Sequence, residues 1–145
     1  MEIQKDIDQL QNILYRAKRN WGRANQHAIE YLEHWESLSK QTLKELISFD
    51  PPSEPRESLT GAILGKKFHI SVNPILKTGA IYAELTISLP PSEHHNRTEL
   101  GRLLIDKDGR IYNTNTETVL TEHDDMPSYL LLLNILMATL ETTAQ

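Results

Sequence analysis

The feature that most constrains this chain is a stripe of apolar and small residues through its N-terminal third. These residues recur at alternating steps of four and three. They are Ile3, Ile7, Leu10, Leu14, Ala17, Trp21, Ala24, Ala28, Tyr31, Trp35, Leu38 and Thr42. This is heptad spacing, which places the side chains along one narrow seam of an α-helix. No proline interrupts the pattern before Pro51, and its phase is kept across Gly22. The sequence therefore predicts one long helix over residues 1–49.

A helix of this length is too long for the domain that the rest of the chain can build. Residues 3–47 would span about 65 Å at 1.5 Å per residue. A compact chain of 145 residues has a diameter of only about 40 Å. Each large seam residue left in water would cost about 2 kcal/mol. Three arrangements avoid that cost: pairing with a second copy, fold-back near Gly22, and binding of a foreign chain. We expect pairing in a homodimer.

The expected self-association interface is the middle of the seam. It comprises Leu14, Ala17, Trp21, Ala24, Ala28, Tyr31, Trp35 and Leu38. In an antiparallel pair about a two-fold axis near Gln26, Trp35 lies beside Ala17. This matches a large side chain with a small one, as close packing requires.

After the helix, the apolar period changes to two. Residues 50–57 contain three prolines and predict a stiff connector. Residues 58–122 predict an antiparallel sheet of four to five strands, and a short strand near residues 118–121 is a further candidate. A loop over residues 73–79 would pair Val72 with Ile81 and so place His69 beside Glu84. The sequence Asp108-Gly109 between two apolar runs predicts a hairpin turn.

The chain closes with a second predicted helix over residues 125–143. Pro127 suits its first turn, and residues 129–140 are apolar nearly all round, which predicts burial on more than one side. The expected fold is therefore α+β in a single domain, residues 1–145. It combines the long heptad-patterned helix, the antiparallel sheet and a buried C-terminal helix.

Composition and charge exclude several function classes. The chain has no cysteine, which rules out disulfides, thiolate metal sites and a cysteine nucleophile. Its net charge of −5 argues against a broad electrostatic grip on nucleic acid. The start of the chain has no signal-peptide pattern, and the longest apolar run is shorter than the roughly 20 residues of a membrane span. We expect a cytoplasmic protein with no membrane partner.

Two groups of residues suggest a metal site, and neither has the required spacing. The first is a set of imidazoles and carboxylates in two loops that an antiparallel sheet allows to share one end: His94, His95, His123, Asp124 and Asp125. It lacks paired ligand spacing, so a polar loop and a helix cap are the preferred interpretation. The second is Asp106-Lys107-Asp108-Gly109, where glycine falls at position four instead of the position six of a calcium loop. We expect neither a metal nor a cofactor.

A run of basic residues on the long helix suggests a nucleic-acid site. Arg16, Lys18, Arg19 and Arg23 surround Trp21, and cations beside an aromatic ring can bind a phosphate backbone. Most of these cations lie opposite the seam, which favours a solvated outer face. Nucleophile and phosphate-loop motifs are missing from the sequence: it contains no Gly-x-Ser-x-Gly, Ser-x-x-Lys or Walker-type pattern.

These observations favour a non-enzymatic function. We expect a homodimeric protein-interaction module of the adaptor, chaperone, immunity or inhibitor type, which binds itself and another protein. A small-ligand-binding or enzymatic domain that uses the sheet face or the loop of residues 92–98 is the first alternative. Nucleic-acid binding through the basic helix face, residues 16–23, is the second.

Overall fold

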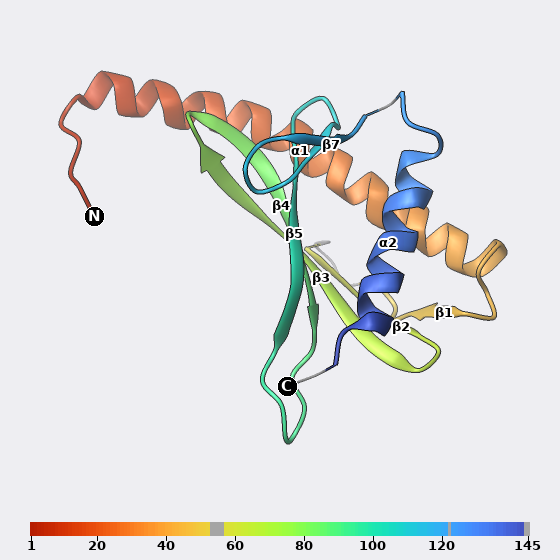
Figure 1. Ribbon diagram of the computed structural model, residues 1–145. Helices are drawn as coiled ribbons and strands as arrows, with labels where there is room; N and C mark the ends of the chain where they lie inside the picture. Colours follow the sequence, from red (N-terminus) through yellow and green to blue (C-terminus); the bar gives the residue numbers. More distant parts are fainter. Residues whose placement is uncertain (53–56, 122, 144–145) are drawn as a thin grey trace.

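The computed structural model describes residues 1–52, 57–121 and 123–143. Two helices cover one face of a curled antiparallel sheet (Figure 1). The α+β class is confirmed. The elements are α1 (Ile7–Gln41), β1 (Ile47–Phe49), β2 (Ser58–Ile63), β3 (Lys66–Lys77), β4 (Ala80–Leu89), β5 (Thr98–Ile105), β6 (Ile111–Tyr112), β7 (Thr118–Leu120) and α2 (Pro127–Glu141). Half of the predicted connector of residues 50–57 lies outside the described residues.

Helix α1 is continuous over 35 residues, or about 52 Å. It begins at Ile7 because the Asp6 side chain caps it, accepting a hydrogen bond from the Gln9 amide at 3.1 Å. The helix passes through Gly22 without a break, which excludes the fold-back arrangement. The predicted bounds of 1–49 were too wide. The amides of Thr42 and Leu43 both donate to the Leu38 carbonyl at 3.0 Å and close the helix there.

The sheet has more strands than the sequence predicted. In the part of the chain that the structure describes, seven strands pair antiparallel in the order β1 to β7, so each strand lies beside its neighbours in sequence. The predicted number of four to five was wrong. Strand β1 fell inside the predicted helix, because Leu43 and Ile47 also fit helical spacing. Strand β7 was only a candidate from its sequence.

The predicted antiparallel pairing of β3 with β4 is present, but the predicted register was wrong. Strand β3 continues through Pro74, which pairs with Ala83, and no loop interrupts it before residue 78. Proline is tolerated there because the pairing of β2 with β3 ends at Ser71, which leaves that part of β3 with a single neighbour. His69 consequently lies opposite Ser88, and Glu84 lies opposite Asn73.

Tight turns connect the central strands. Thr78 and Gly79 form the two-residue turn between β3 and β4, with φ angles of 48° and 77°. Such a turn needs positive φ at both positions, which glycine adopts freely and threonine does not. The predicted Asp108-Gly109 turn is confirmed between β5 and β6. The amides of Asp108 and Arg110 donate to the Asp106 carboxylate there, each at 2.9 Å.

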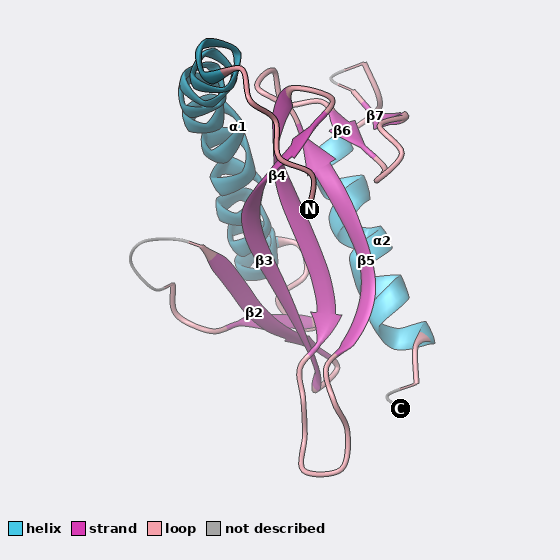
Figure 2. Cartoon of the chain, turned by 90° about the vertical axis from the view of Figure 1, so that its left-hand side faces the viewer, coloured by secondary structure: helices cyan, strands magenta, loops and turns pink. Residues whose placement is uncertain are grey.

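The core lies between the sheet and the two helices, which run side by side behind the strands in Figure 2. Helix α1 contributes Ala24, Ala28, Leu32 and Trp35, and α2 contributes Leu131, Leu132, Ile135 and Leu136. The sheet contributes alternate residues of its central strands, among them Phe68, Ile70, Val72, Leu85 and Ile87. This pattern follows from the period of two in the strands and the steps of three and four in the helices.

Helix α2 is less buried than the sequence predicted. It spans residues Pro127–Glu141, and the residue that caps it is Met126, not Asp124 or Asp125. One face is buried, whereas Leu130, Met137 and Leu140 on the other are exposed. The sequence predicted burial on several sides because α2 is apolar nearly all round. In the folded chain, however, other elements pack against only one side of this helix. Among the described residues, no helix combines the length and apolarity needed to cross a membrane.

Candidate interaction surfaces

The predicted self-association interface is divided between the protein's own core and solvent. Ala24, Ala28 and Trp35 are fully buried against the sheet. Trp21, Tyr31 and Leu38 pack partly against the same core. Leu14 is 65% exposed, and Ala17 is half-buried. The structure therefore leaves only the N-terminal end of the interface available to a partner.

Trp35 shows why the pairing about Gln26 does not fit the folded chain. Its Nε1 donates a hydrogen bond to the Ser128 carbonyl at 2.9 Å, which ties α1 to the start of α2. Its ring lies 6.0 Å from that of Tyr31, centroid to centroid. Placing Trp35 beside Ala17 of a second copy would require it to leave this site. A self-association that keeps this packing would have to use a surface that does not include Trp35.

The exposed end of α1, residues 7–17, is named the α1 arm below. In Figure 1 it projects past the sheet at the upper left. Its seam residues are Ile7, Leu10, Leu14 and Ala17, and Ile7 is 69% exposed. Their spacing continues that of Ala24 and Ala28, so the arm carries the apolar face that is buried farther along the helix. The arm is an apolar surface that the protein's own sheet does not cover.

A second apolar surface lies beside α2. Leu130 and Met137 are exposed on the outer side of the helix. A shallow cavity of about 190 Å³ separates α2 from β5 and is lined mainly by Ile87, Leu100, Leu103, Leu131, Ile135 and Ala138. Strand β6 pairs only with Leu104 and Ile105. Within the described ranges, residues 98–103 of β5 therefore have no strand on their outer side.

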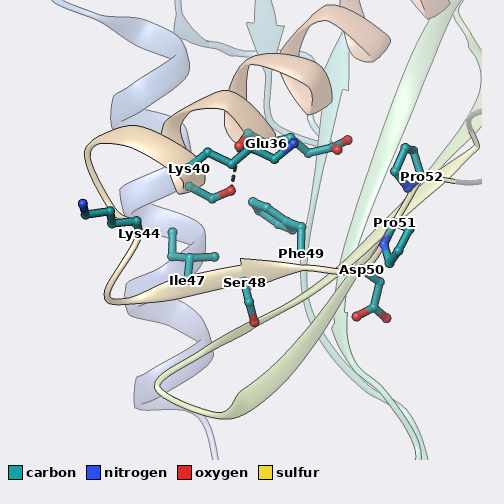
Figure 3. A pocket seen from close by; sticks show the side chains of 10 residues that line it. Glu36, Lys40, Lys44, Ile47, Ser48, Phe49, Asp50, Pro51 and Pro52 are labelled. Carbon is teal, nitrogen blue, oxygen red and sulfur yellow. Dashed lines mark hydrogen bonds between the residues drawn. The ribbon is translucent and has the colours of Figure 1, made fainter.

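The largest cavity described, of about 570 Å³, lies between the end of α1 and β1 (Figure 3). Its polar lining has mixed charge, from Glu36, Lys40, Lys44 and Asp50. Phe49 also lines it, and its ring packs edge-on to Phe68 at 5.8 Å. The cavity is therefore a space of mixed charge between a helix end and an edge strand.

The residues considered as candidate metal ligands do not come together. His94 and His95 lie in the loop between β4 and β5, and His123, Asp124 and Asp125 lie between β7 and α2. These loops are at opposite ends of the molecule in Figure 1, although the sequence allowed them to share one end. Across the residues that the structure describes, no group of three or more His, Asp or Glu side chains has the arrangement of a metal site.

The basic run of α1 is not one continuous surface. Arg23 forms an ion pair with Asp108 at 2.9 Å. The guanidinium of Arg16 lies over the β3–β4 turn, with Nη2 3.7 Å from where a Cβ on Gly79 would stand. Lys18 and Arg19 are exposed to solvent. Two of the four cations are thus directed at turns of the sheet.

The sheet face opposite the helices carries a polar row that sequence reasoning missed, because it depends on the register. Thr60, His69, Ser88 and Glu99 lie opposite one another across β2 to β5. The His69 Nδ1 and Thr60 Oγ1 atoms are hydrogen-bonded at 2.7 Å. Ser88 is fully buried, and its Oγ has no hydrogen-bond partner among the described residues. A nucleophile must reach its substrate, so this row does not constitute a catalytic site.

Burial of His69 predicts a dependence of stability on pH. Desolvation, together with the positive charge of Arg97, lowers the pKa of His69 from its ordinary value of 6.5. The unfolded chain then takes up this proton at a higher pH than the folded chain. We expect the contribution of His69 to the free energy of unfolding to be fully retained above pH 6.5 and to fall as the pH decreases through the folded pKa. An NMR titration of the His69 ring with a midpoint at or above 6.5 would contradict this.

Comparison of the chain with protein-family models, curated protein sequences and solved structures finds no match. The function is therefore inferred from the surfaces of the molecule itself.

Proposed function

We propose that the protein is a non-enzymatic interaction module that self-associates through the α1 arm and, as a dimer, binds other proteins. The observation that carries this proposal is the exposed apolar seam on a helix that extends past its own sheet. Leaving Ile7 and Leu14 in water costs about 1.5–2 kcal/mol for each side chain. Contiguous exposed apolar surface on a soluble domain is typical of an interaction site.

A second α1 arm is the partner that the seam fits. A narrow apolar stripe with heptad spacing is typical of two helices that pack together. Each apolar side chain of one helix then lies between the apolar side chains of the other. In an antiparallel pair about a two-fold axis near Leu10, Ile7 lies beside Leu14 of the other copy. Such a contact is closed, so it produces a dimer and not a filament. Leu14 keeps the interface role expected from the sequence, and Trp35 stays in its own core.

Other observations weigh against the two alternative functions. The imidazoles and carboxylates in the loops are not assembled, and Ser88 is buried, which does not favour an enzyme. Arg23 is neutralised by Asp108, and the chain has a net charge of −5, which does not favour a nucleic-acid interface along α1.

The substitution Leu14→Glu tests the arm. In a two-fold interface it removes two apolar contacts of about 1.5 kcal/mol each, so we expect the dimer dissociation constant to rise about 100-fold. The melting temperature of the monomer should stay close to the wild-type value, because Leu14 is largely exposed. Sedimentation equilibrium at several protein concentrations measures the dissociation constant.

Asn12→Glu is the matched control. Asn12 is exposed, and at about 100° per residue it projects from the side of the arm opposite the seam. The substitution introduces the same charge two residues away from Leu14. A general electrostatic effect would therefore change the dimer dissociation constant of both variants by the same amount. If Asn12→Glu weakened the dimer as much as Leu14→Glu, the seam would not be the interface.

A further inference from the structure

A cleft of about 370 Å³ lies where α1 meets two turns of the sheet. Arg16 and Asn20 of α1 form one wall, residues 78–82 of the β3–β4 hairpin form the second, and Asp106 and Lys107 of the β5–β6 turn form the third. Figure 1 shows the β3–β4 hairpin reaching α1. Three segments far apart in the sequence thus converge on one cleft.

The cleft is lined by hydrogen-bond donors that the protein itself does not use. Five of the residues that line it carry these donors: Arg16, Lys107, Asn20, Thr78 and Tyr82. Among residues 1–52, 57–121 and 123–143, none of these five groups forms a hydrogen bond or ion pair. Two positive charges and three neutral donor residues therefore line one cleft, together with the carboxylate of Asp106.

The carboxylates near the cleft do not neutralise these cations. Asp106 accepts hydrogen bonds from the amides of Asp108 and Arg110, and from the Tyr112 hydroxyl at 2.6 Å. Asp108 is paired with Arg23 at 2.9 Å. Asp106 keeps its negative charge, but Arg16 and Lys107 outnumber it among the lining residues, so the cleft is locally positive on a chain that is negative overall.

The turn that forms the second wall also holds a strained residue. Thr78 has a φ of 48°, a conformation that costs a non-glycine residue energy and that recurs at ligand-binding sites. Thr78 lines the same cleft as Arg16 and Lys107. A serine or threonine hydroxyl beside an arginine and a lysine is a donor set that suits the oxygens of a phosphate group.

We propose that this cleft binds the phosphate group of a small phosphorylated molecule. Arg16 and Lys107 supply the charge, and Asn20, Thr78 and Tyr82 supply neutral hydrogen bonds. The volume leaves room for the rest of a small metabolite beside the phosphate. This site is separate from the apolar seam, and it does not depend on the proposed self-association.

Titration of the full chain with inorganic phosphate and with ribose 5-phosphate, at constant ionic strength, tests the site. We expect saturable shifts of the Gly79 and Ala80 amide signals in NMR spectra, and tighter binding of the sugar phosphate. Arg16→Gln and Lys107→Gln should each weaken binding about tenfold or more, because each removes a charged donor. Lys18→Gln, an exposed cation on the same helix outside the cleft, should leave the affinity unchanged. Unaltered thermal unfolding of the three variants shows that they are folded.

Two results would overturn the proposal. One is the absence of saturable shifts at the β3–β4 turn with both phosphates. The other is equal weakening by Arg16→Gln, Lys107→Gln and Lys18→Gln, which indicates diffuse attraction. A single-stranded oligonucleotide that binds more tightly than ribose 5-phosphate and is equally sensitive to Lys18→Gln would assign the cations to nucleic acid instead.

Discussion

Replacing Trp35 with alanine is expected to lower the free energy of unfolding by about 4 kcal/mol. Trp35 is fully buried where α1, α2 and the sheet meet. The substitution leaves a large cavity and removes the hydrogen bond that Trp35 donates to the Ser128 carbonyl. Denaturation by urea, followed by circular dichroism, measures the loss.

Tyr15→Ala is the control, because Tyr15 is an aromatic residue of the same helix that is 61% exposed. It should change the free energy of unfolding by less than about 0.5 kcal/mol. A Trp35→Ala variant with wild-type stability but a weakened dimer would show that Trp35 faces a second copy. That result would restore the pairing about Gln26 and contradict the packing described above.

Replacing Leu132 with aspartate is expected to cost more than about 4 kcal/mol, which is enough to unfold a domain of ordinary stability. Leu132 is fully buried in α2, and the core around it consists of apolar side chains. Burial of an unpaired carboxylate there has no compensating partner. The expected result is an unfolded or aggregated protein, as judged by near-ultraviolet circular dichroism and by solubility.

Met137→Asp makes the same chemical change on the outer face of α2, where Met137 is 56% exposed. It should leave the fold intact, with a change of less than about 1 kcal/mol. If the two aspartate variants were equally stable, α2 would not be part of the core. Equal loss of folding would mean that the outer face of α2 is covered too.

The heptad stripe predicted the existence of α1 and the face that it buries, but not what covers that face. A run such as Ala24, Ala28 and Trp35 specifies only that one side of the helix is removed from water. The same spacing is compatible with packing against a sheet of the same chain or against a helix of a second chain. The length argument was sound for residues 7–17, which do project past the sheet, and it failed for the middle of the helix.

The errors in the sheet have local causes. Ile47 satisfies both a helical and a strand pattern, so the sequence alone did not separate β1 from α1. Pro74 suggested a loop, but proline is also compatible with a strand that has one free edge. With that loop in place, the register of β3 against β4 was shifted, and His69 was assigned to the wrong neighbour. The polar row across β2 to β5 could not be predicted either, because it depends on the same register.

The phosphate cleft was only partly visible in the sequence. The basic run around Trp21 drew attention to Arg16, but it grouped Arg16 with cations that point elsewhere. Lys107 and Thr78 come from turns that no local pattern connects to α1. Only the topology brings them to the same place.

The mass of the wild-type protein in solution tests the central claim most directly. Sedimentation equilibrium at micromolar concentration should give twice the chain mass of 16.6 kDa, and the Leu14→Glu variant should give the mass of a single chain under the same conditions. A wild-type mass of 16.6 kDa at every concentration up to the solubility limit would contradict self-association through the α1 arm.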